Sequence, residues 1–140
     1  MRIAFDSSAI FKRYSAEGGR DRVQGAFAKA AAVSVAPHLR LEIMASASRL
    51  LRDGLVDEAG FQWLAQQFHA DLASWEVLPY SRAIEDASLR AVDAARVRAM
   101  DALHVGAALV ARADLFVTAD HRQAEAARAL LLPTELIEPV

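Results

Sequence analysis

The chain lacks cysteine, so neither a disulfide framework nor a thiolate metal site is available to it. It also lacks a long hydrophobic run, because Arg, Asp, Glu or Gln interrupts each apolar stretch, and no transmembrane helix is expected. No basic segment followed by an apolar run and a small-residue cleavage site is present at the start, so secretion is not expected. These absences predict a cytoplasmic protein that does not enter a membrane. Any metal ion must be held by oxygen or histidine ligands.

A strong charge imbalance is also missing. The net charge is −2, whereas nucleic-acid-binding modules usually carry a basic footprint, so a simple DNA- or RNA-binding module is disfavoured. Lysine is scarce, with Lys12 and Lys29 alone, and arginine supplies the remaining positive charge. The planar guanidinium group of arginine matches the geometry of phosphate better than the ammonium group of lysine does. At 140 residues and 54% apolar content, residues 1–140 are expected to form one domain with a sizeable core.

Short apolar runs alternate with segments of helical periodicity. We expect strands at residues 2–5, 33–35, 75–79 and 115–117, with an edge strand at 136–137. Helices are expected at residues 8–14, 21–32, 39–52, 58–74, 82–95, 102–113 and 122–131. This alternation predicts an α/β fold in which helices cover both faces of a central, mostly parallel sheet of four or five strands.

Four carboxylates have related positions in this pattern. Asp6 follows the first strand and Asp120 follows the fourth, while Glu42 and Asp101 lie at the starts of helices. In a parallel sheet the strand ends and the following helix starts share one edge, so the four are expected to converge. Clustered carboxylates call for a divalent cation, and oxygen ligands favour Mg²⁺ or Mn²⁺. Such an ion activates water and stabilises charge on a phosphodiester.

A structural role for the same residues is the alternative. Asp6, Asp101 and Asp120 each precede an expected helix, and Asp is among the best N-cap residues. Glu42 alone is typical of a solvated helix residue. Spacing by itself therefore leaves both the metal site and the helix caps open.

Sequence context around the acids favours the metal site. The four acids lie in the segments Asp6-Ser7-Ser8-Ala9, Leu41-Glu42-Ile43, Met100-Asp101-Ala102-Leu103-His104 and Val117-Thr118-Ala119-Asp120. Together they resemble the acidic motifs of the PIN-domain family, and their order and spacing are most similar to those of the VapC-like toxins of bacterial toxin–antitoxin pairs. The resemblance extends over essentially the whole chain.

The resemblance implies a three-layer α/β/α, PIN-like domain that acts as a Mg²⁺- or Mn²⁺-dependent endoribonuclease. The catalytic and metal-binding residues that it implies are Asp6, Glu42, Asp101 and Asp120, with Ser8 and Thr118 as accessory hydroxyls that hold a carboxylate or a water. It further implies in-line attack of water on phosphorus, which leaves 3′-hydroxyl and 5′-phosphate ends. The implied partners are the RNA substrate, a second copy of the chain in a homodimer, and an antitoxin whose C-terminal segment reaches the active site.

Several other residues have expected roles. Arg40 and Arg49 lie near the predicted cleft edge and are our candidates for phosphate contacts. His104 lies one turn after Asp101, and we expect a hydrogen-bonded packing role for it. Trp63 lies off the apolar stripe of its helix and is a candidate partner contact. His121 departs from the commonest form of the last motif, so Asp120 has two alternative roles, through a water or at the helix start.

Other acid-bearing α/β domains fit the sequence less well. A phosphoacceptor receiver needs a lysine near the last strand, but none follows Lys29. A haloacid-dehalogenase-like phosphatase needs a second Asp two residues after Asp6, where Ser8 stands. No Gly-rich loop follows a strand, which disfavours a phosphate-binding loop. The alternatives that remain are a PIN-like binding module whose acids only cap helices, and a nuclease directed at DNA.

Overall fold

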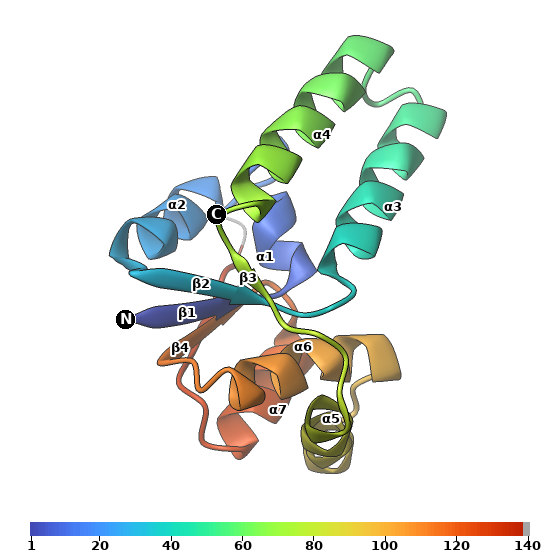
Figure 1. Ribbon diagram of the computed structural model, residues 1–140. Coiled ribbons are helices and arrows are strands. Elements are labelled where there is room, and N and C mark those ends of the chain that lie inside the picture. Colours follow the sequence, from blue (N-terminus) through green and yellow to red (C-terminus); the bar gives the residue numbers. More distant parts are fainter. Residues whose placement is uncertain (139–140) are drawn as a thin grey trace.

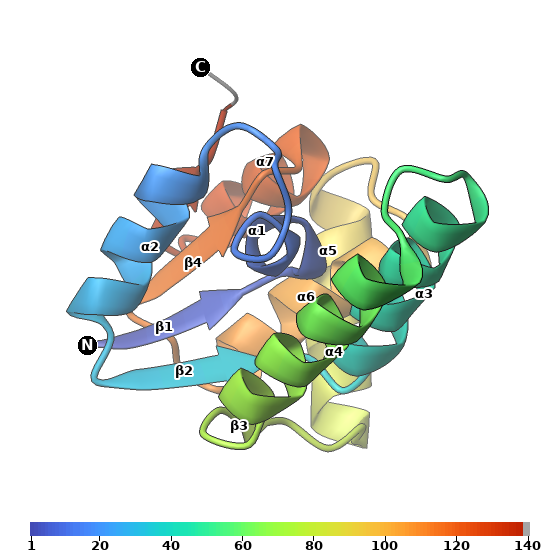
Figure 2. The ribbon, with the colours of Figure 1, turned by 90° about the horizontal axis from the view of Figure 1, so that it is seen from above.

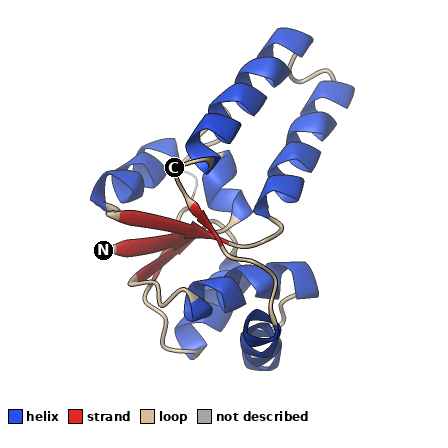
Figure 3. Cartoon of the chain, viewed as in Figure 1, coloured by secondary structure: helices blue, strands red, loops and turns tan. Residues whose placement is uncertain are grey.

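Five parallel strands form the centre of the molecule, with helices on both faces of the sheet (Figures 1 and 3). The computed structural model describes residues 1–138. The strands are β1 (Arg2–Phe5), β2 (Ala32–Val35), β3 (Glu76–Val77), β4 (Leu115–Thr118) and β5 (Thr134–Leu136). Their order is β3-β2-β1-β4-β5, and all four pairings are parallel. The predicted three-layer α/β/α architecture is confirmed.

Seven helices connect these strands within residues 1–138. They are α1 (Ser7–Phe11), α2 (Arg20–Lys29), α3 (Leu39–Arg52), α4 (Glu58–Leu72), α5 (Arg82–Ala94), α6 (Ala99–Val110) and α7 (His121–Ala129). The prediction was wrong at the start of α6, which begins at Ala99, so Asp101 lies inside its first turn. Among the described residues, no helix has both the length and the apolar character needed to cross a membrane.

Local capping signals set several helix boundaries. The Asp57 side chain accepts a hydrogen bond from the Gly60 amide at 2.8 Å and starts α4. Ser81 accepts one from the Ile84 amide at 3.2 Å and starts α5. Gly54 follows α3 with a φ of 71°, a conformation that favours glycine over residues with a Cβ atom. These boundaries follow from short-range chemistry, which explains why the sequence predicts them closely.

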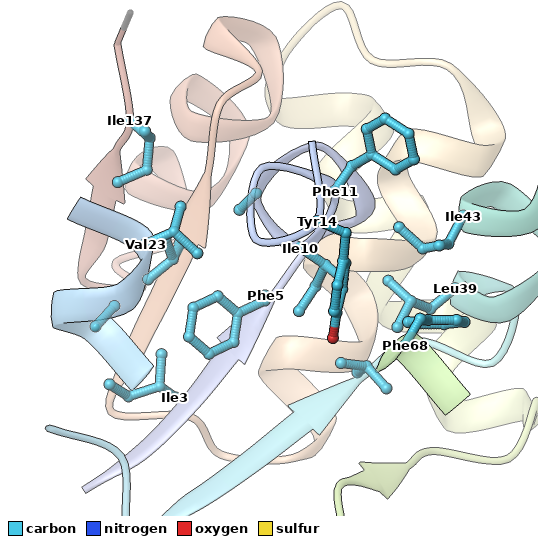
Figure 4. Packing of buried hydrophobic residues seen from close by; sticks show 14 of the residues in the cluster. Ile3, Phe5, Ile10, Phe11, Tyr14, Val23, Leu39, Ile43, Phe68 and Ile137 are labelled. Atoms are coloured by element: carbon cyan, nitrogen blue, oxygen red, sulfur yellow. The ribbon is translucent and has the colours of Figure 1, made fainter. Parts of the chain in front are cut away.

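The two faces of the sheet are packed with different kinds of side chain. On the side of α1 to α4, large residues such as Phe5, Ile10 and Phe68 fill the core (Figure 4). On the side of α5 to α7 the core is rich in alanine, so helices approach closely. A Cβ atom added at Gly106 of α6 would lie 2.8 Å from the Ser88 amide nitrogen of α5. This close packing fixes α6, and with it Asp101 in its first turn.

The chain reverses its direction of travel across the sheet at β1. It proceeds from β1 to β2 and β3 on one side, and β4 and β5 are then added on the other side (Figure 2). In open α/β sheets, ligands bind at such a switch point, outside the carboxyl ends of the strands. Asp6 directly follows β1, and Thr118 ends β4. The fold therefore brings the first and last acidic motifs to its most favourable place for a site.

Candidate active site

Asp6 is the most deeply buried carboxylate of the site, with an exposed fraction of 0%. It caps α1, because its Oδ1 accepts a hydrogen bond from the Ala9 amide at 2.9 Å. The Ser8 hydroxyl lies 2.9 Å from Oδ1 and 2.7 Å from Oδ2, and the Thr118 hydroxyl donates to Oδ2 at 2.8 Å. Both hydroxyls that the sequence suggested as accessory groups thus hold this carboxylate.

The surroundings of Asp6 disfavour the ionised form of its carboxyl group. Burial raises the pKa of the Asp6 carboxyl, while His104 and the hydrogen bonds from Ser8, Ala9 and Thr118 lower it without cancelling that rise. Within residues 1–138 it has no ion pair with a basic side chain. Three donors occupy a carboxylate that offers about four lone-pair directions, so capacity for a further ligand remains. A buried carboxylate of this kind is stabilised by a cation.

Ser8 and Thr118 also join the two loops at the switch point. The Ser8 hydroxyl oxygen accepts a hydrogen bond from the Ala119 amide at 3.0 Å. The Thr118 hydroxyl oxygen accepts one from the Asp120 amide, also at 3.0 Å. Each hydroxyl therefore donates to Asp6 and accepts from the loop after β4. This arrangement fixes the position of Asp120 relative to Asp6.

Asp101 and Asp120 form a second acidic pair, joined through Gln123. Asp120 caps α7 by accepting from the Gln123 amide at 2.9 Å, and the buried Gln123 side chain donates to Asp101 at 3.3 Å. Partial burial raises the pKa of Asp101, repulsion from Asp120 and Glu42 adds to this rise, and His104 and Gln123 oppose it. Sequence reasoning missed Gln123. Its only signal is its place three residues after a capping Asp.

Glu42 lies in the first turn of α3 and is held by residues from two other helices. The Ser7 hydroxyl donates to its Oε1 at 2.9 Å, and Nε2 of His104 lies 2.5 Å from the same oxygen. Burial raises the pKa of Glu42, but hydrogen bonding and charge from His104, the Ser7 hydrogen bond and the charge of His38 outweigh it, so the pKa is lowered. Glu42 is therefore a charged, oriented carboxylate at neutral pH.

His38, Glu42 and His104 form a compact group whose possible ligand atoms lie within 4.8 Å of one another. Nε2 of His104 faces a carboxylate oxygen, and Nε2 of His38 faces the Met100 carbonyl oxygen at 2.8 Å. Because both partners are acceptors, each Nε2 must carry a proton. Nδ1 of each ring is buried and has no hydrogen-bond partner within residues 1–138. Both histidines thus contact the site around Glu42, and His104 is buried and hydrogen-bonded, as expected from the sequence.

The four carboxylates share one edge of the fold without forming a single contact cluster. The group around Glu42 is the one set of three or more His, Asp or Glu side chains within residues 1–138 whose ligand atoms come within 4.8 Å. Asp101 and Asp120 line a common cleft, and Asp6 lies buried beside the loop that bears Asp120. His104 lies among these acids and lowers the pKa of Asp6, Glu42 and Asp101.

The cleft beside the acids has a volume of about 350 Å³ and a basic rim. Its lining residues are Arg96, Arg98, Asp101, Asp120, His121 and Arg122. Arg40, a candidate phosphate contact, instead donates to His69 at 2.9 Å and lines a different cavity. Arg49 lies two turns along α3 from Glu42, about 10 Å away along the helix axis, and does not line the cleft. The arginines that line this cleft are Arg96, Arg98 and Arg122.

These features define a class: a parallel α/β domain with carboxylates at the carboxyl edge of its sheet. The family model for the PIN domain matches residues 3–129. The chain therefore belongs to the PIN domain family. The comparison with curated protein sequences gives no match.

Solved structures share the fold at low sequence identity. A toxin–antitoxin complex from Klebsiella pneumoniae has a chain with a TM-score of 0.71 and 14% identity, covering 99% of each chain. A chain of FitAcB from Neisseria gonorrhoeae has a TM-score of 0.74 and 14% identity, covering 94% of this chain and 95% of the other. PAE2754 from Pyrobaculum aerophilum has a TM-score of 0.69 and 12% identity, with coverages of 96% and 89%. At these identities the likeness concerns the fold.

Proposed function

We propose that this chain is a metal-dependent endoribonuclease that acts as the toxin of a toxin–antitoxin pair. The observation that carries the proposal is Asp6, a fully buried carboxylate at the switch point of the sheet with no basic ion-pair partner among the described residues. Asp101 and Asp120 lie along the same edge with mutually repelling charges. Membership of the PIN domain family and the likeness to a chain of a toxin–antitoxin complex support the proposal.

The donor set suits a hard divalent cation. The expected ligands are carboxylates, which favour Mg²⁺ or Mn²⁺ over softer metals. Three of the four have an oxygen that accepts no hydrogen bond from residues 1–138, namely Oε2 of Glu42, Oδ2 of Asp101 and Oδ2 of Asp120. Asp6, Glu42, Asp101 and Asp120 would hold the ion or its waters. When bound, the ion would lower the pKa of water and stabilise charge on a phosphodiester.

The protein itself supplies the orientation of these carboxylates. Ser8 and Thr118 hold the plane of the Asp6 carboxylate, and Gln123 bridges Asp101 to the loop of Asp120. His104 and Ser7 both bind Oε1 of Glu42, which leaves Oε2 directed elsewhere. Partners that hold a ligand in this way commonly affect metal affinity or activity 10- to 100-fold, as an order of magnitude. These hydrogen bonds would hold the carboxylates in place for an ion.

The proposal extends to partners and location. The chain is proposed to act in the cytoplasm as a single domain over residues 1–140, to form a homodimer, and to be inhibited by an antitoxin protein. Two observations are compatible with protein partners: Trp63 of α4 is 49% exposed, and Leu89 and Met100 are exposed beside an apolar cavity of about 350 Å³. Exposed aromatic residues are enriched at protein interfaces.

A binding module without nuclease activity is the second candidate, and one observation favours it. Asp6 and Asp120 both cap helices, as this alternative requires. Asp101 does not, since Arg98 occupies the N-cap of α6. Capping also does not require the two extra hydroxyl donors at Asp6. A nuclease directed at DNA remains a third candidate, because metal-assisted hydrolysis does not require a 2′-hydroxyl.

The proposal is tested by cleavage of end-labelled RNA with Mg²⁺ or Mn²⁺, with and without chelator. Asp6→Asn is the test variant, and Asp53→Asn is its control because Asp53 is an exposed acid at the end of α3. We expect metal-dependent cleavage by the wild type and the control, and loss of cleavage in the test variant. A matched DNA strand distinguishes the third candidate. Absence of metal-dependent cleavage by the folded wild type across several RNA classes would contradict the nuclease proposal.

A further inference from the structure

Three arginines at the rim of the acidic cleft remain without ion-pair partners. Arg96 and Arg98 lie in the loop between α5 and α6, and Arg122 is the second residue of α7. All three are exposed and line the cleft of about 350 Å³ with Asp101 and Asp120. Within residues 1–138, none of the three comes within 4.0 Å of an acidic side chain. No acidic side chain among residues 1–138 therefore neutralises their charges in an ion pair.

The loop is anchored so that its arginines stay at the rim. Val97, between Arg96 and Arg98, is buried against the alanine-rich core under α5 to α7. Its amide donates to the Ala95 carbonyl at 3.0 Å, and the Arg98 carbonyl accepts the first hydrogen bond of α6, from the Ala102 amide at 2.8 Å. The backbone of the loop is thus fixed at both ends, and the two guanidinium groups extend from a defined position.

The cleft has a charge opposite to that of the whole chain. Its three guanidinium groups and two carboxylates give a local charge of +1, with His121 neutral, while the chain carries −2. The helix starts add to this field: α6 and α7 both begin at the cleft, and no side chain caps α6. A phosphate group is the ligand that such a field and paired guanidinium forks recognise.

We infer that Arg96, Arg98 and Arg122 bind the phosphodiester backbone of single-stranded nucleic acid beside the acidic site. This inference rests on the proposed function and assigns its substrate-binding residues. The cleft of about 350 Å³ is in the size range of small-ligand sites, so a flexible single strand can place one phosphate with its nucleotide there. The contact is to phosphate, so it carries no base preference. It also provides the basic footprint that the overall charge does not show.

The test measures binding apart from cleavage. A labelled single-stranded RNA of about 12 nucleotides is titrated in chelator and followed by fluorescence anisotropy between about 50 and 200 mM salt. The test variant is Arg96→Gln with Arg98→Gln. The control is Arg20→Gln with Arg90→Gln, which changes the net charge equally at exposed arginines outside the cleft. Circular dichroism and thermal unfolding verify that both double variants are folded.

We expect the test variant to bind at least about 10-fold more weakly at low salt, with a salt slope shallower by about 1.4, near 0.7 for each phosphate that is no longer neutralised. The control is expected to stay within about twofold of the wild type, and Arg122→Gln to weaken binding in the same direction as the test variant. Because phosphate is the ligand, a DNA strand of the same sequence should lose affinity by a similar factor. The double variant Arg96→Lys with Arg98→Lys should keep the salt slope of the wild type and lose part of the affinity.

Equal weakening by the test and control variants, or no binding by the wild type, would overturn the inference. The proposed function fails separately. If the wild type binds through these arginines but never cleaves with metal present, the inference stands without the nuclease. If the wild type cleaves and the double variant binds and cleaves like it, the nuclease stands and the inference is wrong.

Discussion

Nε2 of His104 lies 2.5 Å from Oε1 of Glu42, although the two residues are 62 positions apart in the chain. His104 is buried on α6, and Glu42 lies in the first turn of α3, so this contact joins the two sides of the site. The His104 proton fixes one carboxylate oxygen and leaves the other free. We interpret His104 as a positioning residue for Glu42.

Replacement of His104 tests this role. His104→Leu removes the donor, so we expect Mn²⁺ affinity and cleavage to fall about 10- to 100-fold. His104→Gln retains a side-chain N–H donor and should recover much of that loss. Isothermal titration with Mn²⁺ measures the affinity, and urea unfolding distinguishes a local effect from a loss of fold. Equal Mn²⁺ affinity in the leucine variant and the wild type would contradict the positioning role.

Removal of the Ser8 hydroxyl tests the support of Asp6. Ser8→Ala leaves the buried Asp6 carboxylate with one donor fewer and the Ala119 amide without a partner, so the free energy of unfolding should fall by about 1–3 kcal/mol. Ser48→Ala on α3 is the matched control, and its change should stay within about 0.5 kcal/mol. Urea unfolding in chelator measures both. Equal changes in the two variants would mean that the Ser8 hydrogen bonds contribute nothing to stability.

Alanine substitutions at two glycines test the close helix packing that fixes the position of Asp101. Gly106→Ala would place a Cβ 2.8 Å from the Ser88 amide nitrogen and 2.9 Å from the Ile84 carbonyl oxygen, so we expect a loss of about 1–3 kcal/mol or more. Gly25→Ala in α2 meets nothing within 4 Å and should stabilise the protein by about 0.5–1 kcal/mol. Thermal unfolding compares the pair. A tolerated alanine at position 106 would show that α5 and α6 are packed less closely.

The raised pKa of Tyr14 predicts a loss of stability at alkaline pH. Burial raises the pKa of Tyr14, and its hydrogen bond to Asp71 at 2.6 Å raises it further. Because the folded-state pKa exceeds the unfolded value of about 10, the stabilisation is complete below that pH and is lost as the pH rises above it. Tyr14→Phe should therefore show a shallower decline between about pH 9 and pH 11 than the wild type. Parallel declines in urea-unfolding free energy would contradict the shift.

Features set by local chemistry could be predicted from the sequence. The bounds of α3 match the expected residues 39–52, since a strong apolar stripe and Gly54 define them. The start of α6 was missed because Arg98, its N-cap, makes no side-chain capping bond and gives no signal. Strand β3 is shorter than expected, with only Glu76 and Val77, as suits an edge strand close to Pro79.

The positions of the four acids in the fold could also be predicted, but the side chains that contact them could not. Asp6 and Asp120 reach the same edge because parallel strands end together, a rule that the alternation of elements reveals. The contact between His104 and Glu42 depends on how α6 is rotated against α3, which no short-range pattern records. The arginine rim likewise depends on the path of the loop around Val97, so the sequence did not indicate that Arg96 and Arg98 line the cleft.

Direct titration of Mn²⁺ into the metal-free protein, followed by electron paramagnetic resonance, tests the central claim that these carboxylates hold a divalent ion. The wild type and Asp53→Asn are expected to bind the ion alike, and Mg²⁺ should compete for the same site. Asp6→Asn and Asp101→Asn are each expected to lose at least about 10-fold in affinity while remaining folded. No Mn²⁺ binding by the wild type, or binding that both variants retain in full, would contradict the metal site and leave the acids as helix caps and structural groups.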